Sequence, residues 1–466
     1  MHGFRRRRDS DRLSRPDDSS GESGRRLRAG GGRRLAAAAV ALGLGVAAAA
    51  SSGAIALAPV SAAASPLVIA DLAPFTGPDA ALGGYYDASC VAATKVMNAD
   101  GGVLGHTMTC ATFDTRGDPA DAVPAANQMF ATTPNLAMVI GCTSDEAASV
   151  VPIINSHKMV EFCMTGQSEF DHVHYPYFFR LVPPDLSESY AMVAIAKYTK
   201  HYKKIALAFG NDIGSQTFVQ PAIQSIKKAG LKLTANVTLD LTASTFRTEA
   251  ETVVQSHPDV ILTEALGAAE ATFLSEVKQL NGGKMIPVIG TSATIDPAWF
   301  SSVGAAIGKS TLAKYYVADN LVTATSGPEY KPFHSAMEAV KSQVTSEDSG
   351  SLQTLLSGPG AVHLFDGMNL AALAMIMAKS TVPSVYKADI LKIGDGVKGA
   401  VVVNSFAKGK AELAKGKAIR YIGPGGPTSF DSYHDSPGIF QIDGYKASGA
   451  VTVVGGISTT HYRAVQ

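Results

Sequence analysis

A regular alternation of short apolar runs with amphipathic stretches, over residues 66–300, constrains the fold of this chain more than any other feature. Residues 66–70 are continuously apolar, as expected of a strand buried on both faces. Residues 83–98 then place apolar side chains such as Ala88 and Val91 at helical spacing. Strands that alternate with helices in this way predict a parallel β-sheet covered by helices on both faces.

The alternation runs through twice, so we expect two doubly wound α/β units of similar length in tandem, at 66–184 and 185–312. Asp185 and Glu188 have the spacing of a capping box and predict a helix that begins there and runs to His201. Beyond residue 300 the pattern is less regular. We expect a strand at 311–317, a long apolar helix at 362–379, a Ser/Gly-rich loop at 342–360 and short strands over 419–454.

The tandem units also predict where a ligand would bind. Doubly wound parallel sheets bind ligands beyond the carboxyl ends of their strands, where the strand order reverses. Two such units that face one another would place the site in the cleft between them. The pattern alone therefore predicts an α/β protein with a ligand-binding cleft.

The charges of the chain are unevenly distributed. The formal net charge is zero, but residues 1–65 hold 11 Arg, no Lys and 5 acidic residues, which leaves residues 66–466 with a net charge of about −6. A mildly acidic body argues against nucleic acid as a partner, because phosphate binding needs a basic face.

Residues 1–64 have the organisation of a secretory leader. An Arg-rich segment is followed by an Ala/Leu/Val/Gly stretch over 35–58 and then by small residues at 61–65. Basic, apolar and small-residue regions in this order predict a signal peptide and export, to the periplasm, the cell surface or the medium. A buried Ala-rich helix and an uncleaved membrane anchor are the alternatives. Arg33-Arg34 is a weak sign of a twin-arginine signal.

Export changes how the four cysteines are interpreted. In an oxidising compartment they can form two disulfides, in any of three pairings. Their spacings fit no zinc-binding pattern, and four buried thiols are the alternative. The cysteines are Cys90, Cys110, Cys142 and Cys163.

Several motifs, in order along the chain, resemble those of one known family. They are the segments 69–77 (IADLAPFTG), 98–105 (NADGGVLG), 113–119 (FDTRGDP), 139–141 (VIG) with Ser144, and 179–185 (FRLVPPD). Over roughly 66–320 the series resembles the extracytoplasmic solute-binding proteins of ABC transporters, of the leucine/isoleucine/valine-binding type, which have the type I periplasmic binding protein fold. Beyond that point the resemblance is weaker, although 421–431 resembles the family's late hairpin.

The resemblance implies two lobes joined by three chain crossovers, near Pro183, Thr311 and Gly423. The first lobe would then hold residues 65–184 and 313–422, and the second lobe 185–312 and 423–466. Closure of the lobes on a ligand would be a hinge motion.

The implied first lobe also suggests a pairing of the cysteines. Cys90 would lie on the first helix and Cys110 on the second strand, which packs beside that helix. Cys142 and Cys163 would each follow the end of one of two neighbouring strands. We therefore expect the disulfides Cys90–Cys110 and Cys142–Cys163.

The resemblance further implies which residues touch the ligand. Backbone N–H groups at a helix N-terminus and hydroxyl groups hold a carboxylate well, and Ser144 lies between a strand and a helix, as that requires. In the family a Ser that aligns with Ser144 binds the ligand carboxylate, although a plain N-cap is the alternative here. The expected ligand-binding residues are Thr76, Tyr85, Thr143, Ser144, Thr165, Gly166, Gln167, Asp212, Leu266 and Ser292.

Two departures from the family pattern concern the polar groups. Thr291 and Ser292 stand where leucine-type members place a Glu against the ligand ammonium group, and Asp145, Asp212 or Glu264 could replace that acid. Asp145 also follows Ser144 directly, together with Glu146, and these two acids would compete with a bound anion.

A third departure concerns the walls of the cleft. Ile213 and Leu266 stand at two positions that are aromatic in leucine-type members. Tyr85 and Tyr86 begin the first helix, and one of them could stack on a ligand. The family is therefore better defined than the ligand.

No motif of a serine hydrolase, a zinc protease or a nucleotide-binding enzyme is found in the body, and the pair His172 and His174 is expected to be a solvated loop. We expect no enzyme activity, no metal and no cofactor. The expected function is that of a monomeric exported receptor. It would capture an amino acid or a related small carboxylate or amide and deliver it to the permease subunits of an ABC transporter. A ligand-sensing module of the same fold is the main alternative, and an exported enzyme on this scaffold is the third.

Overall fold

Parallel β-sheets organise the chain, as the alternation of strands and helices predicted. The computed structural model describes residues 64–343, 356, 360–436 and 438–466. Apart from its last residue, the expected leader lies outside the described residues, and so does most of the expected loop at 342–360.

The first sheet has five parallel strands in the order β2-β1-β3-β4-β5. Ile69 and Ala73 of β1 belong to one hydrophobic cluster, and Ala70 and Leu72 belong to the cluster on the other side. Side chains alternate across a strand, so β1 is buried on both faces, as its apolar run predicted. The strands are β1 (Ala64–Ala73), β2 (His106–Asp114), β3 (Leu136–Gly141), β4 (Glu161–Cys163) and β5 (Phe178–Arg180).

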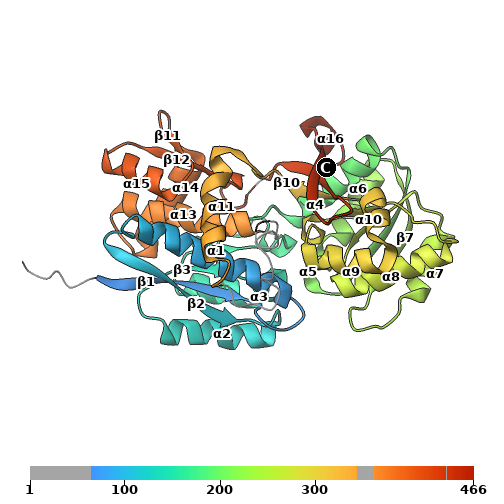
Figure 1. The fold of residues 1–466 in the computed structure, drawn as a ribbon, viewed down its shortest axis with the longest axis horizontal. Helices are drawn as coiled ribbons and strands as arrows, with labels where there is room; N and C mark the ends of the chain where they lie inside the picture. Colours follow the sequence, from blue (N-terminus) through green and yellow to red (C-terminus); the bar gives the residue numbers. More distant parts are fainter. Residues whose placement is uncertain (1–63, 344–355, 357–359, 437) are drawn as a thin grey trace, which may run out of the picture. The chain divides into compact units, whose positions relative to one another are not determined.

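Helices cover both faces of this sheet. On one face lie α2 (Pro119–Thr132) and α3 (Ser144–Ser156), and on the other lie α1 (Ala80–Ala99) and the later helix α13 (Ala361–Ala378) (Figure 1). The start of α2 shows why the sequence folds locally as it does. Asp118 caps the helix by accepting a 2.7 Å hydrogen bond from Ala120 N, and Pro119 takes the first position, where a missing N–H costs nothing.

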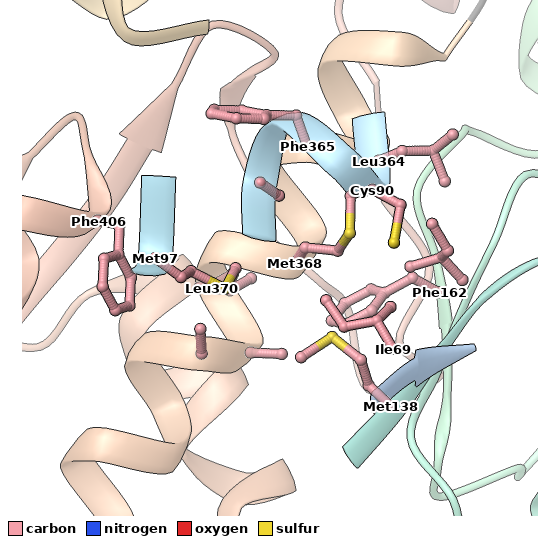
Figure 2. Close-up of a cluster of buried hydrophobic side chains, with 14 of the residues drawn as sticks. Ile69, Cys90, Met97, Met138, Phe162, Leu364, Phe365, Met368, Leu370 and Phe406 are labelled. Carbon is pink, nitrogen blue, oxygen red and sulfur yellow. The ribbon is translucent and has the colours of Figure 1, made fainter. Parts of the chain in front are cut away.

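The long apolar helix expected at 362–379 is α13, which forms the centre of the largest hydrophobic core. Leu364 and Met368 of this helix lie among Ile69, Met138 and Phe162 from the sheet (Figure 2). In the described part of the chain, α13 alone is long and apolar enough to cross a membrane, but 72% of it is buried inside the protein. Its composition is therefore that of a core helix. Two further helices pack against the same core, α11 (Gly327–Val340) and α14 (Pro383–Asp395).

The cysteines follow the expectation in one pair and not in the other. The disulfide Cys90–Cys110 links α1 to β2, which confirms the first pair. Cys142 and Cys163 are buried free thiols, so the second expected disulfide is wrong. Each thiol lies against an oxygen. Cys163 Sγ donates to the Cys142 carbonyl at 3.2 Å, and Cys142 Sγ donates to Glu161 Oε1 at 3.7 Å.

The second sheet has seven strands in the order β15-β14-β10-β9-β8-β6-β7. The strands β6 to β10 run parallel to one another, and β14 and β15 add antiparallel strands at one edge. The strands are β6 (Lys204–Gly210), β7 (Lys232–Leu239), β8 (Val260–Glu264), β9 (Val288–Gly290), β10 (Tyr316–Leu321), β14 (Phe440–Tyr445) and β15 (Val451–Gly456).

Helices also cover both faces of the second sheet. One face carries α4 and α6, and the other carries α7 to α10. Short helices α5 and α16 complete this part of the chain. The helices are α4 (Asp185–Ala194), α5 (Ile213–Thr217), α6 (Val219–Lys228), α7 (Arg247–Gln255), α8 (Gly267–Leu280), α9 (Pro297–Ile307), α10 (Lys309–Tyr315) and α16 (Thr459–Arg463).

The start of α4 differs from the expected capping box. Pro184 takes the N-cap position, and the helix continues into one π-helical stretch at Ile195–Thr199. The carboxyl group of Asp185 accepts a hydrogen bond from Thr217, and that of Glu188 accepts one from Ser292 at 3.0 Å. Both carboxyl groups therefore make tertiary contacts, which the local spacing could not reveal.

The chain crosses between the two sheets three times, and the second crossing falls later than expected. The stretch 311–317, expected as a strand, lies mostly in α10. The strand β10 follows it and pairs with β9 in the second sheet, so the return to the first sheet comes after Leu321 and not near Thr311. The difference arises because β10 is hydrogen-bonded on both sides, to β9 and to β14.

The third crossing also falls later than expected. A three-stranded sheet holds the chain past Gly423, and Phe430 still packs in the core of α13. The chain joins the second sheet again only at β14. This small sheet contains β11 (Val401–Val403), β12 (Ile419–Gly423) and β13 (Gly426–Pro427), with α15 (Phe406–Ala414) beside it. From here on, residues 64–183 and 322–436 are the first lobe, and residues 184–321 and 438–466 are the second lobe.

A buried cluster of ion pairs connects two of the segments in which the chain crosses between the sheets. The Arg180 guanidinium is fully buried and lies 2.8 Å from Asp171 and 3.2 Å from Asp435. Arg180 stands just before the first crossing and Asp435 just before the third. Because a buried cation is costly without partners, the three side chains hold these two segments together.

Candidate functional site

A cavity of about 890 Å³ lies between the two lobes. It is lined by residues that follow the carboxyl ends of parallel strands, such as Ser144 after β3, Leu266 after β8 and Ser292 after β9. This is the position at which doubly wound sheets bind ligands, and two such edges meet here. Side chains from both lobes therefore converge on one cleft.

The N-terminus of α3 opens onto this cavity. Thr143 takes the N-cap position, and Glu146 completes a capping box in which its Oε1 accepts a 3.1 Å hydrogen bond from Thr143 N. Ser144 is the first residue of the helix, so it is not the N-cap. Its hydroxyl lies 3.3 Å from the Thr165 hydroxyl and lines the cavity together with Thr143.

The loop after β4 contains three of the predicted ligand-binding residues. One of them lines the cavity, and the other two are buried and do not line it. Gly166 lines the cavity, and its carbonyl accepts a 2.7 Å hydrogen bond from Asp185 N. A Cβ at this position would lie 1.8 Å from Asp185 Oδ1, so the close approach requires glycine. Thr165 and Gln167 are buried and do not line the cavity. The Gln167 carbonyl accepts a 3.3 Å hydrogen bond from Arg180.

Two other predicted residues also lie outside the lining. Thr76 is exposed, and its hydroxyl donates to Asp114 Oδ2 at 2.5 Å. Tyr85 is buried, and its hydroxyl donates to Asp296 of the second lobe, so it joins the lobes beside the cavity. The neighbouring Tyr86 lines the cavity and donates to the Cys142 carbonyl at 3.1 Å.

The predicted residues of the second lobe all line the cavity. They are Asp212, Leu266 and Ser292. Asp212 caps the short helix α5 by accepting a 2.7 Å hydrogen bond from Ser215 N. The Ser292 hydroxyl and backbone N–H both donate to Glu188, at 3.0 and 3.2 Å.

Acidic side chains dominate the polar lining. The first lobe contributes Asp79 and Asp145. The second lobe contributes Asp185, Glu188, Asp212, Glu264, Asp296 and Asp443. Sequence reasoning named Asp145, Asp212 and Glu264 as candidates, and it missed the others because their positions depend on the two lobes coming together. The spacing of Asp185 and Glu188 was interpreted as a helix-capping box, so their place at the cavity was not predicted.

Burial and mutual proximity disfavour the charged forms of these acids. Burial, then the nearby Asp145, Glu146 and Asp212, raise the pKa of Asp79 to about 7. Burial is also the main reason that the pKa of Asp145 rises to about 6, against a lowering hydrogen bond from the backbone of Gly214.

The acids of the second lobe behave in the same way. Burial raises the pKa of Asp185 to about 8 and that of Glu188 to about 7, although each accepts hydrogen bonds that act in the opposite direction. Burial also raises the pKa of Glu264 well above its usual range, and its carboxyl group accepts a hydrogen bond from Thr291. The cleft therefore concentrates carboxyl groups, and none of the described residues that line it is Lys or Arg.

One group of side chains in the described residues has metal-binding chemistry, and it lies outside the cavity. The ligand atoms of Cys142, Glu161 and Cys163 all lie within 4.8 Å of one another, and all three residues are buried. His172 and His174, the pair noted in the sequence, both pack their rings against Tyr433. Both histidines are exposed and lie outside helices and strands, as expected of a solvated loop.

The fold and the cleft define a class of two-lobed α/β binding proteins, and comparisons with known proteins identify the family. The sequence matches the family model described as periplasmic binding protein over residues 66–358, and the chain belongs to this family. Membership places the chain among binding proteins rather than enzymes, in a family that is typically extracytoplasmic. No curated protein sequence matches the chain at a significant level.

Solved structures of binding proteins share the fold. A leucine-binding protein LivK from Thermotoga maritima MSB8 is similar with a TM-score of 0.66 at 16% identity, over 84% of this chain and 99% of that protein. The branched-chain amino acid binding protein LivJ from Streptococcus pneumoniae, in complex with isoleucine, has a TM-score of 0.65 at 16% identity, over 84% and 99%. A solute-binding protein of an ABC transporter from R. palustris, in complex with benzoate, has a TM-score of 0.64 at 15% identity, over 84% and 96%.

Proposed function

We propose that this protein is an exported receptor that captures a small polar solute between its lobes and delivers it to the permease of an ABC transporter. The observation that carries the proposal is the cavity of about 890 Å³, which is lined by polar groups from both lobes at the carboxyl ends of their strands. Similar structures include binding proteins for isoleucine and for benzoate, so the fold accommodates chemically different solutes.

The residues proposed to contact the solute are the predicted ones that line the cavity, with Tyr86 added. In the first lobe they are Thr143, Ser144 and Gly166, and in the second lobe they are Asp212, Leu266 and Ser292. Thr165 and Gln167 would position these groups from behind. We also propose that residues 1–64 direct export and that the receptor acts as a monomer.

Contacts across the cleft support a closing motion as part of this function. Gly214 N of the second lobe donates to Asp145 Oδ1 of the first lobe at 2.9 Å, and the Tyr85 hydroxyl donates to Asp296. Contacts of this kind are made when the lobes approach and are lost when they separate. A solute bound between the lobes would shift that equilibrium toward the closed state.

Thermal-shift screening of the purified protein against amino acids, amines, carboxylates and amides tests the proposal. We expect at least one class to raise Tm with its concentration, as ligand linkage requires, and calorimetry to give one site per chain. A folded protein that binds no member of any class would contradict the receptor function. Genes for permease and ATPase subunits beside this one would favour transport, whereas a neighbouring kinase or regulator would favour the sensing alternative.

A further inference from the structure

The charge of the residues that line the cleft restricts the chemical class of the solute more than the shape of the cleft does. Eight residues that line the cavity are Asp or Glu, and none of the described lining residues is Lys or Arg. The one lining histidine, His363, is neutral, because burial lowers its pKa to about 4. Arg180, whose charge acts to lower the pKa of the lining Asp185, does not line the cavity and is paired with Asp171 and Asp435. Within the described residues, no cationic side chain of the lining itself therefore balances these acids.

The place where a carboxylate would ordinarily bind is already surrounded by acids. Asp145 and Glu146 occupy the first turn of α3, next to Ser144. Asp79 and Asp212 approach the same turn from other segments: Asp212 raises the pKa of both Asp79 and Asp145, and Asp145 and Glu146 raise that of Asp79. An anionic solute at this helix N-terminus would meet four carboxyl groups, and that repulsion opposes the attraction of the helix dipole.

One acid of the lining also has an acceptor atom that is not used. Asp212 lines the cavity, and its Oδ2 atom is buried without a hydrogen-bond partner in the described part of the chain. Its Oδ1 atom is used in capping α5, through Ser215 N. A buried acceptor without a donor is costly, so the Asp212 carboxyl group has capacity for a further donor, although Oδ2 lies beside Gly210 of its own loop.

Two aromatic side chains lie at the same cavity as the carboxyl groups. Trp299 and Tyr86 are both at least nine-tenths buried, and both line the same cavity as the acids. Aromatic rings attract organic cations, most strongly where water is excluded. Carboxylates together with aromatic rings suit a solute that is cationic and partly apolar.

We propose that the cleft selects a small organic cation, with ammonium or amidinium groups that donate to Asp145 and Asp212. This inference rests on the receptor function proposed above and specifies its solute class. A cation bound there would balance charge that the protein leaves unbalanced. A carboxylate or a strongly anionic solute would add negative charge beside Asp145 and Asp212, so we expect this cleft to disfavour benzoate-like acids.

The test is a calorimetric series on the full chain with matched probes. The cationic probes are 1,4-diaminobutane, spermidine and agmatine, the other probes are leucine and benzoate, and Ca²⁺ and Mg²⁺ serve as inorganic cations. We expect at least one organic cation to bind one site per chain, with an affinity that falls as salt is added. Leucine, benzoate and the metal ions should bind at least about tenfold more weakly, the ratio that the loss of one charge-assisted contact gives.

Charge-removing variants locate the site. Asp145→Asn and Asp212→Asn keep an oxygen that can accept from Gly214 N and Ser215 N, so the fold should be preserved. Each should weaken cation binding about tenfold or more, as expected for the loss of a charge-assisted hydrogen bond. Glu251→Gln is the control, since Glu251 is half-exposed on α7 and pairs with Arg247. That variant should bind as the unmodified protein does.

The outcomes separate this inference from the receptor function. Binding of leucine or benzoate but of no organic cation would overturn the cation inference and leave the receptor function standing. Binding of Ca²⁺ or Mg²⁺ alone would overturn it as well. Cation binding that is unchanged in both Asp variants would place the cation elsewhere and overturn the assignment to this cleft. Binding of no probe or screened solute would contradict both proposals.

Discussion

The backbone N–H of Gly214 donates a 2.9 Å hydrogen bond to Asp145 Oδ1, and this bond joins the two lobes at the edge of the cavity. Asp145 is in the first turn of α3, whereas Gly214 is in the first turn of α5. A carboxyl group that faces the cleft thus also acts as a latch between the lobes. In the proposed receptor, lobe closure and solute binding would therefore depend on the same side chain.

Removing the latch should open the protein. Asp145→Ala removes the acceptor, so we expect small-angle scattering of the ligand-free protein to show a larger radius of gyration than before. Tm should fall by only a few degrees, because one hydrogen bond contributes about 1 kcal/mol. Asp145→Asn keeps the acceptor and is the matched control. An equal increase in radius for both variants would assign the effect to charge and not to the latch.

The two cysteine pairs should differ in their chemistry. In the native protein neither Cys142 nor Cys163 should react with a thiol reagent, because both are fully buried. Unfolding without reductant should expose two thiols per chain, and unfolding with reductant should expose four. A count of zero after unfolding without reductant would show that the second pair is oxidised in solution.

Reduction of the Cys90–Cys110 disulfide should destabilise the first lobe. The bridge closes a loop with a sequence separation of 20, and a loop of this length contributes about 3 kcal/mol through the entropy of the unfolded chain. We expect the denaturant midpoint to fall on reduction. The double variant Cys90→Ala/Cys110→Ala should give the same midpoint with and without reductant.

The stability of the ligand-free protein should fall as pH rises. The pKa of Asp79 is raised to about 7 and that of Asp145 to about 6, well above their values in an unfolded chain. Between about pH 4 and pH 7 the native state therefore binds more protons than the unfolded state, and the free energy of unfolding decreases as pH increases. The groups that face Asp79 are Asp145, Glu146 and Asp212, all acidic, so none opposes this trend.

A single variant tests the contribution of Asp79 to that trend. Asp79→Asn removes one proton-linked group, so the slope of Tm against pH should become shallower and stability at pH 8 should rise by an amount on the order of 1 kcal/mol. Asp100→Asn, at an exposed position, is the control and should leave the slope unchanged. A slope that is identical in the Asp79 variant would assign the pH dependence to other buried acids.

Loss of the buried ion-pair cluster should be costly. Arg180→Met leaves Asp171 and Asp435 without their cation, and breaking a buried pair in this way costs about 3–5 kcal/mol. Arg116→Met is the control, because Arg116 and Asp121 form an exposed pair that contributes about 0–1 kcal/mol. Urea denaturation of both variants provides the comparison. Similar midpoints for the two variants would contradict a role for the cluster in holding the crossings together.

Local sequence patterns predicted most of the strands and helices over residues 66–300, because each of these elements is encoded mainly by the residues within it. The strand β1 is a continuous apolar run, and α2 begins with Asp118 and Pro119, which suit the N-terminus of a helix in any context. The prediction from local spacing was wrong at the start of α4. There Asp185 and Glu188 have the spacing of a capping box, but their carboxyl groups accept hydrogen bonds from Thr217 and Ser292 of other segments.

The candidate site shows the same difference between features that depend on local sequence and features that depend on distant residues. The position of Ser144 between a strand and a helix was visible in the sequence, and Gly166 was expected at the site, but the close approach of Asp185 to Gly166 appeared only in the structure. The exposed position of Thr76 and the latch between Tyr85 and Asp296 were not visible, because each depends on a partner tens or hundreds of residues away. The state of Cys142 and Cys163 was equally hidden, since neighbouring strands bring the two thiols close without directing them at each other.

The sequence by itself determined that the chain forms two doubly wound units, and it predicted a cleft where their strand edges meet, because hydrophobic periodicity and turn residues encode secondary structure locally. Only the tertiary structure decided that β10 belongs to the second sheet, where β9 and β14 satisfy its backbone on both sides. It also decided that eight acids from both lobes share one cavity. Burial and repulsion between charges depend on distances in space, and the order of residues along the chain does not specify these distances.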